Sequence, residues 1–199
     1  MKKYIKIIFY SLLIVIGIGL LVNWMYFRAQ IGYYLNPPAE SFTDETHSAE
    51  KTGESNHLSI ESLGISAPVI YLDEVTENAF QIALRSGVVH YPGSPKPGEA
   101  GNVYLFGHSS DFPTSKGDYK TVFALLPKIK TGAIIELSDD TGKIFRYAVA
   151  ETKVVSPNDI HVLDQDESKH QLSIQTSYPV GTALKRFIVI SYLIEDPVN

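Results

Sequence analysis

An uncharged, strongly apolar segment near the N-terminus constrains this chain more than any other feature. No charged residue occurs between Lys6 and Arg28, and residues 7–22 read IIFYSLLIVIGIGLLV. A helix of about 20 apolar residues, rising ~1.5 Å per residue, spans the ~30 Å hydrocarbon core of a bilayer. The sequence therefore predicts a transmembrane anchor over residues 7–27, preceded by a short N-terminus over residues 1–6.

The flanking charges predict the orientation of this anchor. Lys2, Lys3 and Lys6 precede it and only Arg28 follows it closely, so the positive-inside bias places the N-terminus in the cytoplasm. The sequence Trp24-Met25-Tyr26-Phe27 suits an aromatic belt at the far interface and lacks the small residues of a cleavage site. We expect a single-pass protein of the cell membrane with an extracytoplasmic domain. A cleaved signal peptide and a buried core helix are the alternatives.

The remainder of the chain divides into a polar tether and one domain. Asn36-Pro37-Pro38 interrupts any helix, and the residues that follow it are polar with few apolar side chains. Such a segment buries too little apolar surface to offset its ordering entropy, so we expect a flexible linker over residues 28–57. The domain is then predicted to extend over residues 58–199.

Within that domain, short apolar runs alternate with turns rich in Gly and Pro. A helical spacing of apolar residues predicts one short helix over Glu77–Arg85, and Asp139-Asp140-Thr141-Gly142 predicts a hairpin turn. The pattern is typical of an all-β domain, a closed or nearly closed β-barrel with short helices. The runs predicted as strands are Leu58–Ile60, Ile65–Tyr71, Asn102–Phe106, Ala133–Leu137, Phe145–Val155, Leu172–Gln175 and Phe187–Leu193.

Composition excludes several classes of function. The chain has no cysteine, so disulfides, thiolate catalysis and cysteine-ligated zinc are excluded. Four of the 17 basic residues flank the anchor, which leaves 13 against all 22 acidic residues in the rest of the chain. An acidic domain is a poor partner for nucleic acid. The spacing of His, Asp and Glu predicts no metal site.

Three polar residues stand at the ends of apolar runs, where a rigid scaffold can present a side chain to a cleft. His108 follows one run and Gly107, Ser177 follows another just before a Tyr-Pro turn, and Arg186 opens the last run. A histidine transfers protons near neutral pH, a serine attacks with the help of a base, and an arginine stabilises an oxyanion. Taken singly, each has an ordinary alternative as a turn residue or a solvated edge charge.

In this order the three residues resemble the sortase family of cell-surface transpeptidases. The signature of that family is Thr-Leu-x-Thr-Cys, with an arginine on the next strand and a histidine far upstream. The matching stretch here is Ser173-Ile174-Gln175-Thr176-Ser177, with serine in place of the nucleophilic cysteine. The connection from Tyr178 to Arg186 is similar to that of class D- and E-like sortases. The resemblance covers about residues 58–194.

The resemblance implies an eight-stranded barrel that binds a Leu-Pro-x-Thr-Gly-like sorting signal at the C-terminus of a surface protein. Sortases cleave after threonine through an acyl-enzyme and pass the acyl group to an amine of peptidoglycan or a pilin subunit. By position, His108 would be the general acid/base, Ser177 the acyl acceptor and Arg186 the oxyanion or substrate clamp. Thr176 and His90 are expected to contact substrate, and no cofactor is implied.

Serine at position 177 leaves three origins open: an engineered trapped form, a natural inactive homologue and a natural serine-using variant. A thiol with a pKa of ~8.5 is partly ionised near neutral pH, whereas a hydroxyl must lose its proton as it attacks. We therefore expect slow acylation with peptide binding retained. A non-catalytic module that binds sorting signals and a serine hydrolase are the alternative functions, although no Gly-x-Ser-x-Gly elbow is present.

Overall fold

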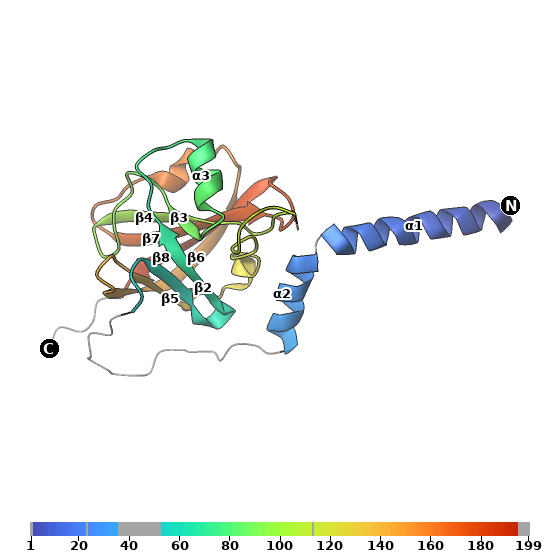
Figure 1. Cartoon of the computed structure of the whole chain (residues 1–199). Coiled ribbons are helices and arrows are strands. Elements are labelled where there is room, and N and C mark those ends of the chain that lie inside the picture. The colour runs from blue at the N-terminus through green and yellow to red at the C-terminus, as the bar shows by residue number, and fades with distance from the viewer. Residues whose placement is uncertain (1, 23, 36–52, 113, 195–199) are drawn as a thin grey trace.

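The computed structural model describes residues 2–22, 24–35, 53–112 and 114–194. Figure 1 shows a long N-terminal helix that stands away from the rest of the chain, a second helix beside the domain, and a β-barrel. The long helix, α1, extends over Lys2–Val22. It is the one helix of the described residues that is long and apolar enough to cross a membrane, and none of its apolar window is buried.

The second helix corrects the prediction of a flexible linker over residues 28–57. This helix, α2, extends over Trp24–Leu35, so the start of the predicted linker is helical. Residues 36–52 of that linker lie outside the described residues. The segment contains no proline, and Asn36-Pro37-Pro38 follows it directly, so a helix can form up to Leu35. The predicted anchor over residues 7–27 is accordingly divided between α1 and α2.

The eight strands close into one barrel, which confirms the predicted fold. Their order around the barrel is β1-β2-β3-β4-β7-β8-β6-β5. Most neighbours pair antiparallel, but β2 pairs with β3, and β4 with β7, in parallel. The strands are β1 (His57–Ile60), β2 (Ile65–Ile70), β3 (Val88–His90), β4 (Gly101–Phe106), β5 (Ile134–Ser138), β6 (Ile144–Val155), β7 (His170–Tyr178) and β8 (Lys185–Leu193).

Short helices occupy the connections between these strands. The predicted helix near Glu77 is present as α3 (Glu77–Ala83), and the Thr76 hydroxyl caps it by accepting the Ala79 N–H at 3.2 Å. The other connections contain the 3-10 helices η1 (Glu61–Leu63), η2 (Leu126–Lys128) and η3 (Ile160–Leu163).

Sequence periodicity finds seven of the eight strands and misses β3, because its three residues are too few to show a period. β7 and β8 also extend further than predicted, to Tyr178 and back to Lys185. Ladder hydrogen bonds come from the backbone, so polar residues can continue a strand beyond its apolar run. The predicted hairpin turn is confirmed: the Asp139 carboxylate accepts the backbone N–H groups of Thr141 and Lys143.

Alternate residues of each strand fill the barrel interior, because successive side chains point to opposite faces. On β7, Leu172 and Ile174 are fully buried in the core cluster. Thr176 follows them on the inner face and is also buried. Gln175 and Ser177 therefore lie on the outer face of the barrel wall.

The barrel closes where β1 meets β5, with Leu58 opposite Leu137. Both side chains are fully buried. We expect Leu58→Ala to lower the free energy of unfolding by about 2–5 kcal/mol, through lost burial and the cavity left behind. Leu184→Ala, at a residue that is 71% exposed, is the matched control and should change stability little. Urea denaturation of both variants tests this, and equal small effects would show that the β1–β5 contact does not stabilise the barrel.

Candidate active site

The candidate site lies where three neighbouring strands meet at one end of the barrel. β7 runs between β4 and β8. On one side, Ser177 is the register partner of Arg186 in the antiparallel β7–β8 pair. On the other side, the Gly107 N–H continues the parallel β4–β7 ladder by donating to the Gln175 carbonyl at 3.1 Å. His108 therefore leaves β4 at the level that Ser177 occupies on β7.

The backbone around His108 is held by contacts from two directions. The Thr176 hydroxyl donates to the Gly107 carbonyl at 2.9 Å from inside the barrel. The Phe123 N–H donates to the His108 carbonyl at 2.9 Å. A Cβ added at Gly107 would lie 2.7 Å from the Phe123 ring, so glycine is required for this close approach. The position of His108 thus depends on β7 and on the connection that follows β4.

Burial lowers the pKa of the His108 imidazole below its ordinary value of 6.5. A less polar surrounding disfavours the charged imidazolium form. The negative charge of Asp111 opposes this effect and raises the His108 pKa, but less strongly. The imidazole is therefore neutral at neutral pH and able to accept a proton from a neighbouring hydroxyl.

Arg186 keeps hydrogen-bond donors available at the start of β8. Its Nη1 donates to the carbonyl oxygens of Ala183 and Lys185, both at 3.1 Å, which fixes one side of the guanidinium. Within the part of the chain that the structure describes, Nε and Nη2 make no hydrogen bond. An arginine held in this way can still donate to a carbonyl or an oxyanion.

Tyr104 and Gln175 occupy the outer face of the wall next to this group. The Tyr104 hydroxyl donates to the Gln175 Oε1 at 2.8 Å, which links β4 and β7 through their side chains. Burial raises the pKa of Tyr104, and the positive charge of Arg186 opposes that rise. The guanidinium charge therefore acts on the Tyr104 hydroxyl of β4, the strand that ends two residues before His108.

A hydrogen bond also joins the two connections that flank the site. The Gly181 N–H, in the connection from β7 to β8, donates to the Ser110 Oγ at 3.0 Å. Ser110 lies two residues after His108, so this bond couples the placement of the histidine to the turn that follows Ser177. Sequence reasoning missed Ser110, because a serine in a turn carries no distinguishing pattern.

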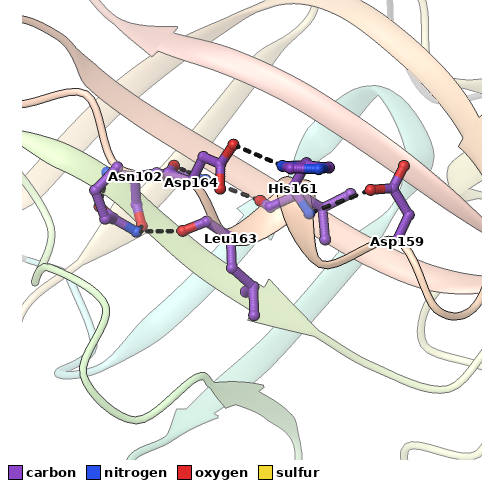
Figure 2. Close-up of polar contacts among 7 residues, drawn as sticks. Asn102, Asp159, His161, Leu163 and Asp164 are labelled. Carbon is purple, nitrogen blue, oxygen red and sulfur yellow. Dashed lines mark hydrogen bonds and ion pairs between the residues drawn. The ribbon is translucent and has the colours of Figure 1, made fainter.

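The connection from β6 to β7 covers the outer face of the wall. Figure 2 shows Asn102 of β4 reaching toward this connection, where its Nδ2 donates to the Val162 and Asp164 carbonyls at 3.1 Å and 3.4 Å. Within the connection, Asp159 accepts the His161 N–H at 3.1 Å, and the His161 ring lies 3.2 Å from the Asp164 carboxylate. The connection from β6 to β7 is therefore an ordered segment that packs beside the strands that carry the site.

Two residues expected to contact substrate lie elsewhere. The Thr176 side chain is buried and bonded to Gly107, so it positions the backbone before His108 instead of facing a ligand. His90 is 5% exposed, and its ring stacks on Tyr71 with centroids 4.5 Å apart. Both side chains face the barrel interior whereas Ser177 lies on the outer face, so the structure does not bring them together with Ser177.

His90 instead lines a pocket of about 450 Å³ at the other end of the barrel. That end carries the first residues of β4 and β7, whereas the candidate site lies at their last residues. Asp139 and Asp140 of the hairpin turn also line this pocket. In the described ranges, no group of three or more His, Asp or Glu side chains could hold a metal ion.

The chain thus presents a histidine, a serine and an arginine at one end of a closed eight-stranded barrel. Residues 58–194 match the model of the Sortase domain, and the chain belongs to the sortase family. Sortase D of Bacillus subtilis (strain 168) is 29% identical over 152 residues. The match covers 75% of this chain and 66% of that relative, just under two thirds of its length.

Solved structures show the same barrel. A sortase D5 transpeptidase from Clostridium perfringens is 27% identical with a TM-score of 0.58, over 74% of this chain and 83% of that one. Sortase C-1 from Actinomyces oris superposes with a TM-score of 0.59 over 88% of this chain and 87% of that one. Its identity is 21%, so this second similarity concerns the fold alone.

The electrostatic setting of His108 gives a direct prediction. Titration of the His108 ring followed by NMR should give a midpoint below 6.5, because burial lowers its pKa. Asp111→Asn removes the charge that favours the imidazolium, so the midpoint should fall further. Asp118→Asn, which removes an exposed carboxylate from the same connection, is the control. A midpoint above 6.5, or an upward shift in the Asp111 variant, would contradict this account.

Proposed function

We propose that this chain is a membrane-anchored sortase that binds a Leu-Pro-x-Thr-Gly-like sorting signal through the site of His108, Ser177 and Arg186. The observation that carries this proposal is the strand register. Ser177 pairs directly with Arg186, and the extended β4–β7 ladder delivers His108 to the same level. Membership of the sortase family and the similarity to a sortase D support it. The acceptor is an amine of peptidoglycan or of a pilin subunit.

In this proposal the reaction is acyl transfer in two steps. The Ser177 Oγ attacks the carbonyl carbon of the signal's threonine, and the His108 imidazole takes the hydroxyl proton. Free guanidinium donors of Arg186 stabilise the oxyanion. The peptide C–N bond then breaks, and His108 returns the proton to the leaving amine. The acceptor amine attacks the resulting ester, which releases the Ser177 hydroxyl and forms the new amide.

The serine limits the first of these steps. A thiolate attacks without a concerted proton transfer, whereas a hydroxyl requires a base already aligned with it. Oxygen and sulfur differ little in size, and the rest of the peptide is held away from the nucleophile. Peptide binding is therefore retained while acylation is slow. A module that binds sorting signals without cleaving them is the second candidate, and the absence of any cysteine favours it.

Restoring the thiol tests the catalytic assignment. Ser177→Cys should raise cleavage of a fluorogenic Leu-Pro-x-Thr-Gly-like peptide by about 10² or more, since ~1.4 kcal/mol of barrier is tenfold in rate. His108→Ala or Arg186→Ala in that background should remove most of the gain, because the three groups act as a unit.

The outcomes of this assay separate the candidates. A folded Ser177→Cys protein that binds the peptides but shows no thiol-dependent cleavage would refute the catalytic roles and favour the binding module. Comparable turnover by the unmodified protein would instead identify a true serine nucleophile. Ser156→Cys, in an exposed turn after β6, is the matched control for a thiol placed elsewhere.

The proposed topology places α1 across the cell membrane with the N-terminus in the cytoplasm. The lysines before α1 and the single arginine soon after it motivate this orientation. Protease added to intact cells should therefore digest the barrel, while an epitope fused before Lys2 should stay protected until the membrane is permeabilised. Protection of the barrel in intact cells would reverse the assignment.

A further inference from the structure

α2 carries an apolar face that no other part of the described chain covers. We call this face the outer face of α2. It consists of four residues at helical spacing: Trp24, Phe27, Ile31 and Leu35. The exposed fraction of these four residues ranges from 37% to 74%. A row of large apolar side chains open to solvent indicates a contact surface.

The opposite face of α2 is turned toward the barrel. Tyr26, Gln30 and Tyr33 lie on it at the same spacing and are partly buried. Tyr33 packs against the core cluster of the barrel. The Nζ of Lys128, in η2, lies 4.8 Å from the ring centroid of Tyr33 and 3.8 Å from that of Tyr34. Both distances are within the range of cation–π attraction, so this lysine fastens α2 to the barrel.

The direction of α2 relative to α1 indicates which surface the outer face of α2 contacts. Figure 1 shows α2 lying across the direction of α1 and alongside the barrel. α2 begins two residues after α1 ends. A helix that lies crosswise at the end of a membrane-spanning helix runs along the membrane surface. Trp and Phe side chains favour that layer, because their rings are stable between headgroups and acyl chains.

We propose that α2 is an interfacial helix whose outer face is buried in the lipid headgroup region and whose inner face seats the barrel on the membrane. This rests on the proposed anchoring by α1. Lipid is the occupant because the outer face begins two residues after the end of α1, whose apolar window over Lys2–Leu21 is unburied. The Lys128 contact then fixes how the barrel is oriented above the bilayer.

The absence of native cysteine allows a direct test in the full-length protein. Single cysteines at Ile31 or Leu35 report on the outer face, and one at Gln30 is the matched control on the inner face. Each is labelled with an environment-sensitive fluorophore in vesicles of phosphatidylcholine and phosphatidylglycerol. Nitroxide-bearing lipid should quench the labels at positions 31 and 35 several-fold more than the label at 30. Iodide in the buffer should quench them less than it quenches a label in an exposed loop of the barrel.

Fluorescence energy transfer tests whether the barrel contacts α2. The donor is Trp24, the only tryptophan of the chain, and the acceptor is attached to the cysteine of a Thr131→Cys variant. Lys128→Ala combined with Tyr33→Ala should reduce the transfer efficiency several-fold, because the barrel moves away from α2. Lys143→Ala is the control, since it removes a lysine that lies over Phe145 elsewhere on the barrel.

Each outcome bears on a different part of the proposal. Protein that does not float with the vesicles refutes the anchor, and the interfacial helix with it, whatever the peptide-cleavage assay gives. Protein that floats but whose labels at Ile31 and Leu35 are quenched by iodide and not by lipid nitroxide refutes the interfacial helix alone. Transfer from Trp24 that is unchanged in the double variant refutes the seating of the barrel through Lys128.

Discussion

The parallel pairing of β4 with β7 is the constraint on which the rest of the structure depends. It joins strands that lie some 70 residues apart in the chain, with Gly101 opposite His170 and Phe106 opposite Gln175. The register of this pair sets the level at which the chain leaves β4, and the Thr176 hydroxyl holds that exit by bonding the Gly107 carbonyl. β8 then adds on the other side of β7. A slip of one residue would turn the Ser177 side chain into the barrel interior and separate it from the outer face.

In the proposed reaction, the nucleophile is a serine oxygen where other sortases use a cysteine sulfur. Burial keeps the His108 imidazole neutral near pH 7, which suits a base that must remove a hydroxyl proton. It suits less well an imidazolium that stabilises a thiolate, since the same burial disfavours the positive charge. Under the proposed function, the environment of His108 is therefore compatible with Ser177 as the nucleophile, and the low nucleophilicity of a hydroxyl limits the rate.

The sequence predicted the barrel and the three residues at its end, because apolar runs mark strands and the order of His108, Ser177 and Arg186 matches a family. It did not predict β3 or α2. β3 is too short to show a period, and α2 lies just before a polar segment, whose composition extended the predicted linker backward over it. Nor did the sequence show that the Thr176 and His90 side chains face away from Ser177. Order along the chain does not say which face of a strand a side chain occupies, and register alone decides that.

The position of β8 in the barrel has a consequence for when the protein can fold during its synthesis. β8 is the last in sequence of the eight described strands, yet it lies between β7 and β6 and pairs with both. A chain that emerges N-terminus first therefore cannot complete this barrel until Lys185–Leu193 has been made. Before that moment Ser177 lacks Arg186, its register partner and the proposed oxyanion donor. A chain that lacks β8 therefore does not assemble the site proposed for acyl transfer.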